Sequence, residues 1–145
     1  MAHDTTYEEL GQRVKELDRE LGEREKELNC LYGLSRIVEE HGTSLNDILQ
    51  EIPALLAAAW QYPDITCARV AMGDEEFATD HFRVSSWRQG ADIIVDGKKA
   101  GRVEIYYLEE RPELDEGPFL KEERRLLDAI AERLGKIIER RHLEE

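Results

Sequence analysis

The first third of the chain carries a heptad pattern of apolar residues. Alternating steps of three and four residues lead through Tyr7, Leu10, Val14, Leu17, Leu21, Leu28 and Leu31. Arg24 alone breaks the pattern, and Glu, Lys and Arg fill the flanking positions. This spacing predicts a coiled-coil helix over residues 5–40 that pairs with a second helix. The alternative is a single solvated helix held by charged pairs, whose apolar stripe would face water.

A second, more apolar helix is predicted over residues 45–60. The preceding HGTS segment is a break, in which Gly42 suits the end of one helix and Ser44 or Thr43 suits the cap of the next. Pro53 lies inside this helix, and we expect it to kink the helix or to delay its last turns.

The pattern then changes to that of an antiparallel sheet. The segments ITCARVAM and EFATDHF flank Gly73 and Asp74, which indicates a hairpin. The segments ADIIV and GRVEIYYL flank a turn that begins with Asp96 and Gly97, and this second signal is stronger because Asp-Gly readily takes positive φ. Between the hairpins, RVSSWRQG predicts one short strand or loop. We therefore expect four or five strands.

Alternation along these strands predicts one apolar face and one mixed face. The apolar face, which helices must cover, contains Ala68, Val70, Met72, Ile93, Val95, Val103, Ile105 and Tyr107. On the mixed face, Arg69 could anchor an anionic ligand, with Arg102 as a second contact and Tyr106 as a hydrogen-bonding wall. The alternative is a solvent-facing sheet on which Arg69 and Glu104 form a cross-strand ion pair.

A final helix is predicted from Pro118 onwards. Pro118 suits the first helical turn, and Glu122 and Glu123 complement the helix dipole. Its apolar residues step by three and four in the same way as those of the first helix; they are Leu127, Ile130, Leu134 and Ile137. We expect both stripes to form a parallel dimer interface through Leu10, Val14, Leu17, Leu21, Leu28, Leu31, Leu127, Ile130, Leu134 and Ile137.

Composition narrows the range of partners. The chain has 145 residues, of which 41% are hydrophobic, and this suits one domain with a modest core. The 33 acidic and 20 basic side chains give a net charge of −13, which repels nucleic acid and anionic membrane surfaces. No signal peptide or spanning segment is present in the sequence, so we expect a soluble cytoplasmic protein without membrane insertion.

The sequence offers little catalytic chemistry. Cys30 and Cys67 lack a CxxC spacing, which favours free thiols over a zinc site or a disulfide. His41 and His81 have no sequence-local triad pattern, and His41 suits the last turn of a helix. The acidic cluster 74–76 lacks the spacing of a calcium loop. We expect neither an enzyme nor a bound metal or cofactor.

As a whole, the pattern resembles a GAF domain with its signalling helices. The similarity rests on the order of the predicted elements and on three segments, EKELNCLYGLSRIVEE, AAAWQYPDITCARV and GKKAGRVEIYYLEERPELDEGPFLKEERRLLDAIAERLGKIIERR. These segments resemble the GAF-like regulatory region found ahead of bacterial histidine kinases and of some phosphoenolpyruvate synthase-like proteins. The similarity covers about residues 25–142.

The resemblance implies an α+β fold and a regulatory function. Residues 1–27 would form a coiled-coil helix, residues 28–118 a GAF-like core, and residues 119–145 a helix that completes the core and leads to an output module. GAF members that enclose a ligand carry a lid where this chain has only residues 79–90, and the NKFDE-like motif is absent. The expected function is therefore a homodimeric signalling domain that transmits helix movements. The alternative is a small-molecule sensor that uses Arg69, Arg102 and Tyr106.

Overall fold

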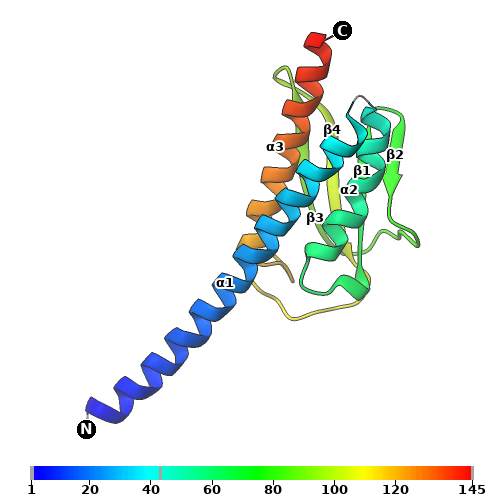
Figure 1. The fold of residues 1–145 in the computed structure, drawn as a ribbon. Coiled ribbons are helices and arrows are strands. Elements are labelled where there is room, and N and C mark those ends of the chain that lie inside the picture. The colour runs from blue at the N-terminus through cyan, green and yellow to red at the C-terminus, as the bar shows by residue number, and fades with distance from the viewer. Residues whose placement is uncertain (1, 43, 145) are drawn as a thin grey trace.

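The computed structural model describes residues 2–42 and 44–144 of the chain, and side chains from 7–42 and 44–141. The described part is an α+β structure with three α-helices and a four-stranded antiparallel sheet (Figure 1). The elements are α1 (Ala2–His41), α2 (Leu45–Ala59), a 3₁₀ turn (Pro63–Ile65), β1 (Thr66–Met72), β2 (Glu75–Ala78), β3 (Trp87–Val95), β4 (Lys98–Tyr107) and α3 (Lys121–Glu144). None of these helices is both long and apolar enough to cross a bilayer.

Both predicted hairpins are confirmed. The strand order is β2-β1-β4-β3, and β1 pairs with β2 across a turn in which Gly73 has a φ of 60°. The β3–β4 turn consists of Asp96 and Gly97, whose φ values of 52° and 79° match the positive pair that a tight hairpin turn requires. β3 begins at Trp87, so the segment predicted as one short strand or loop supplies the first residues of a longer strand.

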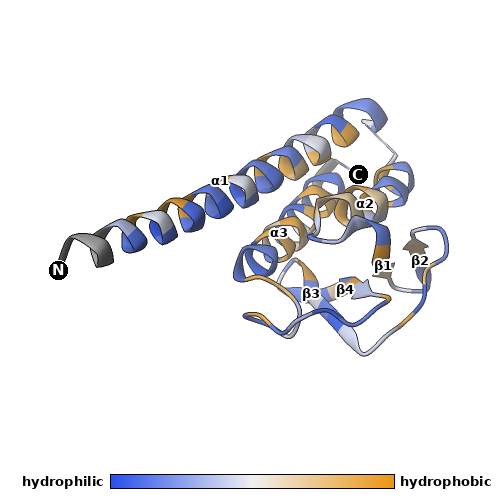
Figure 2. Ribbon diagram, turned by 90° about the horizontal axis from the view of Figure 1, so that it is seen from below, coloured by the Kyte–Doolittle hydropathy of each residue, from blue (hydrophilic) through white to orange (hydrophobic). Residues whose placement is uncertain are grey.

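The helices form two layers above one face of the sheet. α2 packs on β1 and α3 packs on β3, while α1 lies over α2 and α3 (Figure 2). The predicted apolar sheet face is confirmed, since Val70, Ile93, Val103, Ile105 and Tyr107 are all buried in the core. The half of α1 that precedes the core projects away from the domain (Figure 1).

The helix ends explain where α2 and α3 begin. Ser44 caps α2 by accepting a hydrogen bond from the Asp47 amide at 3.3 Å, whereas Thr43 lies outside the described residues. α3 begins at Lys121 rather than at Pro118, because the Glu123 carboxylate accepts the Leu120 amide proton at 2.9 Å. This bond caps the helix in its first turn.

Candidate functional site

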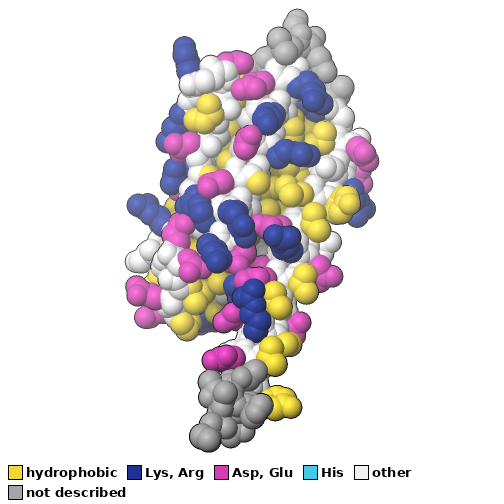
Figure 3. Space-filling model, turned by 90° about the vertical axis from the view of Figure 1, so that its left-hand side faces the viewer, with side chains coloured by type: hydrophobic (Ala, Val, Ile, Leu, Met, Phe, Trp, Pro, Cys, Tyr) yellow, Lys and Arg dark blue, Asp and Glu magenta, His cyan; other side chains and the backbone are white. Residues whose placement is uncertain are grey.

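An apolar seam on α1 is the main exposed apolar feature among the described side chains. We define the seam by residues that are between 41% and 77% exposed, namely Tyr7, Leu10, Val14, Leu17, Leu21, Leu28 and Tyr32. Figure 3 shows hydrophobic side chains that follow the projecting helix and continue onto the domain. A stripe of large apolar side chains in water is unfavourable, so a surface of this kind indicates a site of association.

α1 uses opposite faces for the seam and for its own core. Cys30 is 2% exposed and Leu28 is 55% exposed, because two residues turn a helix through about 200° and so point to nearly opposite sides. Leu34 and Tyr32, again two residues apart, are 0% and 68% exposed. The seam therefore faces away from the domain, and a second helix can reach it without disturbing the core.

The predicted interface on α3 is largely wrong. Leu127, Ile130 and Leu134 are each 0% exposed, because α3 uses this stripe to cover the sheet. These side chains cannot contact a partner chain. Ile137 is partly buried against the core, and so is Leu31 of α1. The remaining predicted interface residues all lie on α1, and the seam there runs into a neighbouring groove.

This neighbouring groove lies between α1 and α3. It has a volume of about 430 Å³, and its apolar floor includes Leu34, Val38 and Ile137. Arg133 and Arg140 of α3 lie along its wall. Val38 lies seven residues after Leu31, at the next d position of the same heptad register, so the groove extends the apolar surface onto the domain.

The mixed sheet face brings together the three predicted ligand contacts, and Glu104 lies among them. Arg69 donates to the Glu104 carboxylate at 2.9 and 2.6 Å, and the Tyr106 hydroxyl donates to it at 2.7 Å. Arg102 instead donates to Asp92 at 2.7 Å. The cross-strand ion pair between Arg69 and Glu104 is thus confirmed, and the two guanidinium groups already have carboxylate partners.

These contacts also set the protonation state of Glu104. Burial opposes ionisation of its carboxyl group, but the hydrogen bonds from Tyr106 and Arg69 outweigh burial and lower its pKa. Phe82 covers part of this face, with Arg69 at 5.0 Å from its ring centre and the Tyr106 ring at 5.5 Å. An anionic ligand would have to displace Glu104 from Arg69.

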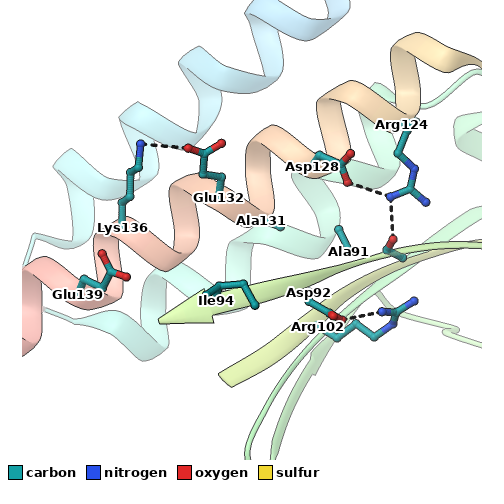
Figure 4. Close-up of a pocket in the computed structure, with 11 residues that line it drawn as sticks. Ala91, Asp92, Ile94, Arg102, Arg124, Asp128, Ala131, Glu132, Lys136 and Glu139 are labelled. Atoms are coloured by element: carbon teal, nitrogen blue, oxygen red, sulfur yellow. Dashed lines mark hydrogen bonds and ion pairs between the residues drawn. The ribbon is translucent and has the colours of Figure 1, made fainter. Parts of the chain in front are cut away.

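A groove at the edge strand β3 was not predicted from the sequence. It has a volume of about 500 Å³ and lies between β3 and α3 (Figure 4). Its charges are already paired, since Arg124 donates to Asp128 at 2.9 Å and Lys136 lies 3.1 Å from Glu132. Arg124 also donates to the Gly90 carbonyl at 2.8 Å and so protects the exposed strand edge.

A buried acidic cluster joins α1 to the first turn of α3. Glu23, Glu122 and Glu123 are 8%, 3% and 2% exposed. Arg19 lies 3.2 Å from one oxygen of Glu122, while the other oxygen has no hydrogen-bond partner among the described residues. Burial raises the pKa of Glu123, although amide donors from Leu120 and Gln61 oppose this shift.

Further candidate ligands lie where α1 meets α2. Among the described residues, Glu40, His41 and Glu51 bring their ligand atoms within 4.8 Å of one another. His41 is in the last turn of α1, as predicted, and contacts Glu51 of α2. The sequence did not reveal this group because Glu51 belongs to a different helix. Both glutamates are exposed, and Glu51 already has the ring of His41 as a hydrogen-bond partner.

Comparisons with known proteins do not identify a family. No protein-family model matches the chain, and neither a curated protein nor a solved structure does so.

Proposed function

We propose that the chain is a regulatory domain that forms a parallel homodimer through α1 and passes changes in helix packing to an attached module. The observation that carries the proposal is the exposed seam, which runs in heptad steps from Tyr7 to Leu28 on the face of α1 opposite the core. A parallel pair buries the same residues from both chains and closes with twofold symmetry.

The position of α1 supports the regulatory part of the proposal. The helix is continuous from Ala2 to His41, so its projecting half and its docked half form one rigid element. A rotation or shift of the paired helices would therefore reach α2 and α3 directly. The GAF-like interpretation belongs to the same proposal and rests on the resemblance in sequence and in element order.

The test is the oligomeric state of the purified chain. We expect a dimer by light scattering and a monomer for the double variant Leu17→Lys, Leu21→Lys, because each lysine places a charge in the seam. The matched control is Gln12→Lys, Asn29→Lys, which adds the same charge at exposed positions outside the seam. A monomeric parent protein, or a dimer that survives the seam substitutions, would contradict the proposal.

The alternative proposal, a sensor for an anionic metabolite, has weaker support from the contacts. Arg69 pairs with Glu104 and Arg102 pairs with Asp92, so a ligand must compete with both carboxylates. Native mass spectrometry of the protein purified from cells separates the two proposals. A reproducible added mass that disappears in Arg69→Ala would favour the sensor, and a dimer without added mass favours the helical module.

A further inference from the structure

Arg24 occupies the one charged position within the apolar seam. In heptad terms, Leu21 and Leu28 are a positions and Arg24 is the d position between them. Arg24 is exposed, and no acidic side chain in the described part of the chain forms an ion pair with it. By contrast, Arg13, Arg19 and Lys26 each pair with a glutamate of the same chain.

A parallel, in-register pair of α1 helices supplies carboxylates to Arg24. A d side chain packs into a hole that includes the neighbouring e position of the second copy, which here is Glu25. The g position Glu20 also faces Glu25 of the second copy, since g and the following e lie side by side in parallel pairs. Without Arg24, this meeting of carboxylates would be repulsive. Upstream, Arg13 faces Asp18 of the second copy in the same way, and this pair is attractive.

An antiparallel pair gives Arg24 no such partners. Each residue at an a position then faces a residue at a d position of the second copy. When the two seams overlap along their whole length, Arg24 lies against Val14 of the second copy. Asp18 would face Asp18, and Glu20 would face Glu20, so like charges would meet at both flanks. A guanidinium group enclosed by apolar side chains without a carboxylate is costly.

We propose that Arg24, together with Glu20 and Glu25, fixes the parallel orientation and register in which α1 pairs with a second copy of the chain. This inference rests on the proposed function, because it assumes that the seam forms a dimer. It assigns a specific task to the residue that interrupts the heptad pattern. A polar group at one core position of a coiled coil can select orientation and register at some expense in stability.

Disulfide exchange between two cysteine variants tests the orientation. Equal amounts of Leu17→Cys and Leu21→Cys are equilibrated in a glutathione redox buffer, and tryptic peptides are identified by mass spectrometry. Parallel in-register pairs link position 17 to 17 and 21 to 21, whereas the antiparallel alignment links 17 to 21. Cys30 and Cys67 are each 2% exposed and do not compete.

With Arg24 present we expect links between identical positions to dominate. Adding Arg24→Leu should raise the 17-to-21 links severalfold while the dimer persists, and Arg24→Lys should keep the original pattern because it keeps the charge. The control Lys15→Leu removes a positive charge of α1 outside the seam and should change nothing. If Arg24→Leu remains a dimer with unchanged links, the inference is wrong and the proposed function stands. If the parent protein is a monomer, both fail.

Discussion

Glu104 is the residue that decides what the mixed sheet face does. Its carboxylate accepts hydrogen bonds from Arg69 and Tyr106, and Arg102 lies 4.0 Å away. Charge-assisted hydrogen bonds of this kind stabilise a fold by about 1.5–3 kcal/mol each. The arginines of this face therefore surround a carboxylate of the same chain. For this reason, arginines at alternating strand positions could not by themselves distinguish an anion-binding site from an ion pair within the sheet.

The lowered pKa of Glu104 gives a pH prediction with a definite sign. Because the pKa is lower in the folded state than the ordinary value of 4.5, the stabilisation is complete above pH 4.5 and is lost as the pH falls below it. Glu104→Gln should lower the free energy of unfolding at pH 7 by about 1–3 kcal/mol, since Arg69 loses its charged acceptor. The difference from the parent protein should shrink as the pH is lowered.

Urea denaturation between pH 7 and pH 3.5 measures this difference. The control is Glu110→Gln, which alters an exposed loop carboxylate and should leave the free energy of unfolding unchanged. Equal stability of Glu104→Gln and the parent protein at pH 7 would show that the carboxylate contributes nothing to the fold.

Most elements were predicted from the sequence, but the role of one stripe was not. The alternation of apolar and polar residues and the Asp-Gly turn predicted the strands and their apolar face, because each of these patterns follows from local backbone geometry. The stripe of α3 was misassigned because Leu127 to Ile137 covers too few turns to separate a coiled-coil seam from a face that packs on a sheet. Only the packing of α3 on β3 distinguishes a coiled-coil seam from a face that covers the sheet.

The second face of α1 was also hidden in the sequence. Its core-facing positions include Cys30, Leu34 and Ile37. Nearer the N-terminus the same face carries Arg19 and Glu23, which are polar. A charged residue on a charged helix gives no signal of contact with a distant element. The acidic cluster at α3 therefore became visible only when the fold brought residues 19 and 122 together.

The contact between Arg19 and Glu122 leads to a prediction about how firmly the middle of α1 is held on the domain. Arg19→Ala removes the cation beside the buried carboxylate of Glu122, so amide hydrogen exchange over residues 19–27 should become faster. Adding Glu122→Gln removes the unpaired charge and should restore part of the protection. Hydrogen exchange followed by mass spectrometry measures both variants. Unchanged exchange in Arg19→Ala would mean that apolar packing alone holds this part of α1.

At the scale of the whole molecule, α1 is a shared element with one face for the core and one for association. Leu34 is 0% exposed within the core, and Leu21 is 64% exposed in the seam. Leu34→Ala should lower the stability of the monomer by about 2–5 kcal/mol, because it leaves a cavity. Leu21→Ala should leave the monomer intact and weaken the dimer by about 1.5–3 kcal/mol per buried side chain.

Concentration separates these two effects. Association raises the Tm as protein concentration increases, so the parent protein should melt at a higher temperature when it is concentrated. In Leu21→Ala this dependence should move to higher concentrations, whereas Leu34→Ala should melt earlier at every concentration. Circular dichroism melts over a hundredfold dilution range, with sedimentation equilibrium for the dimer Kd, provide the measurement. A Tm that is independent of concentration in the parent protein would mean that the seam does not associate, and both proposals built on it would fall together.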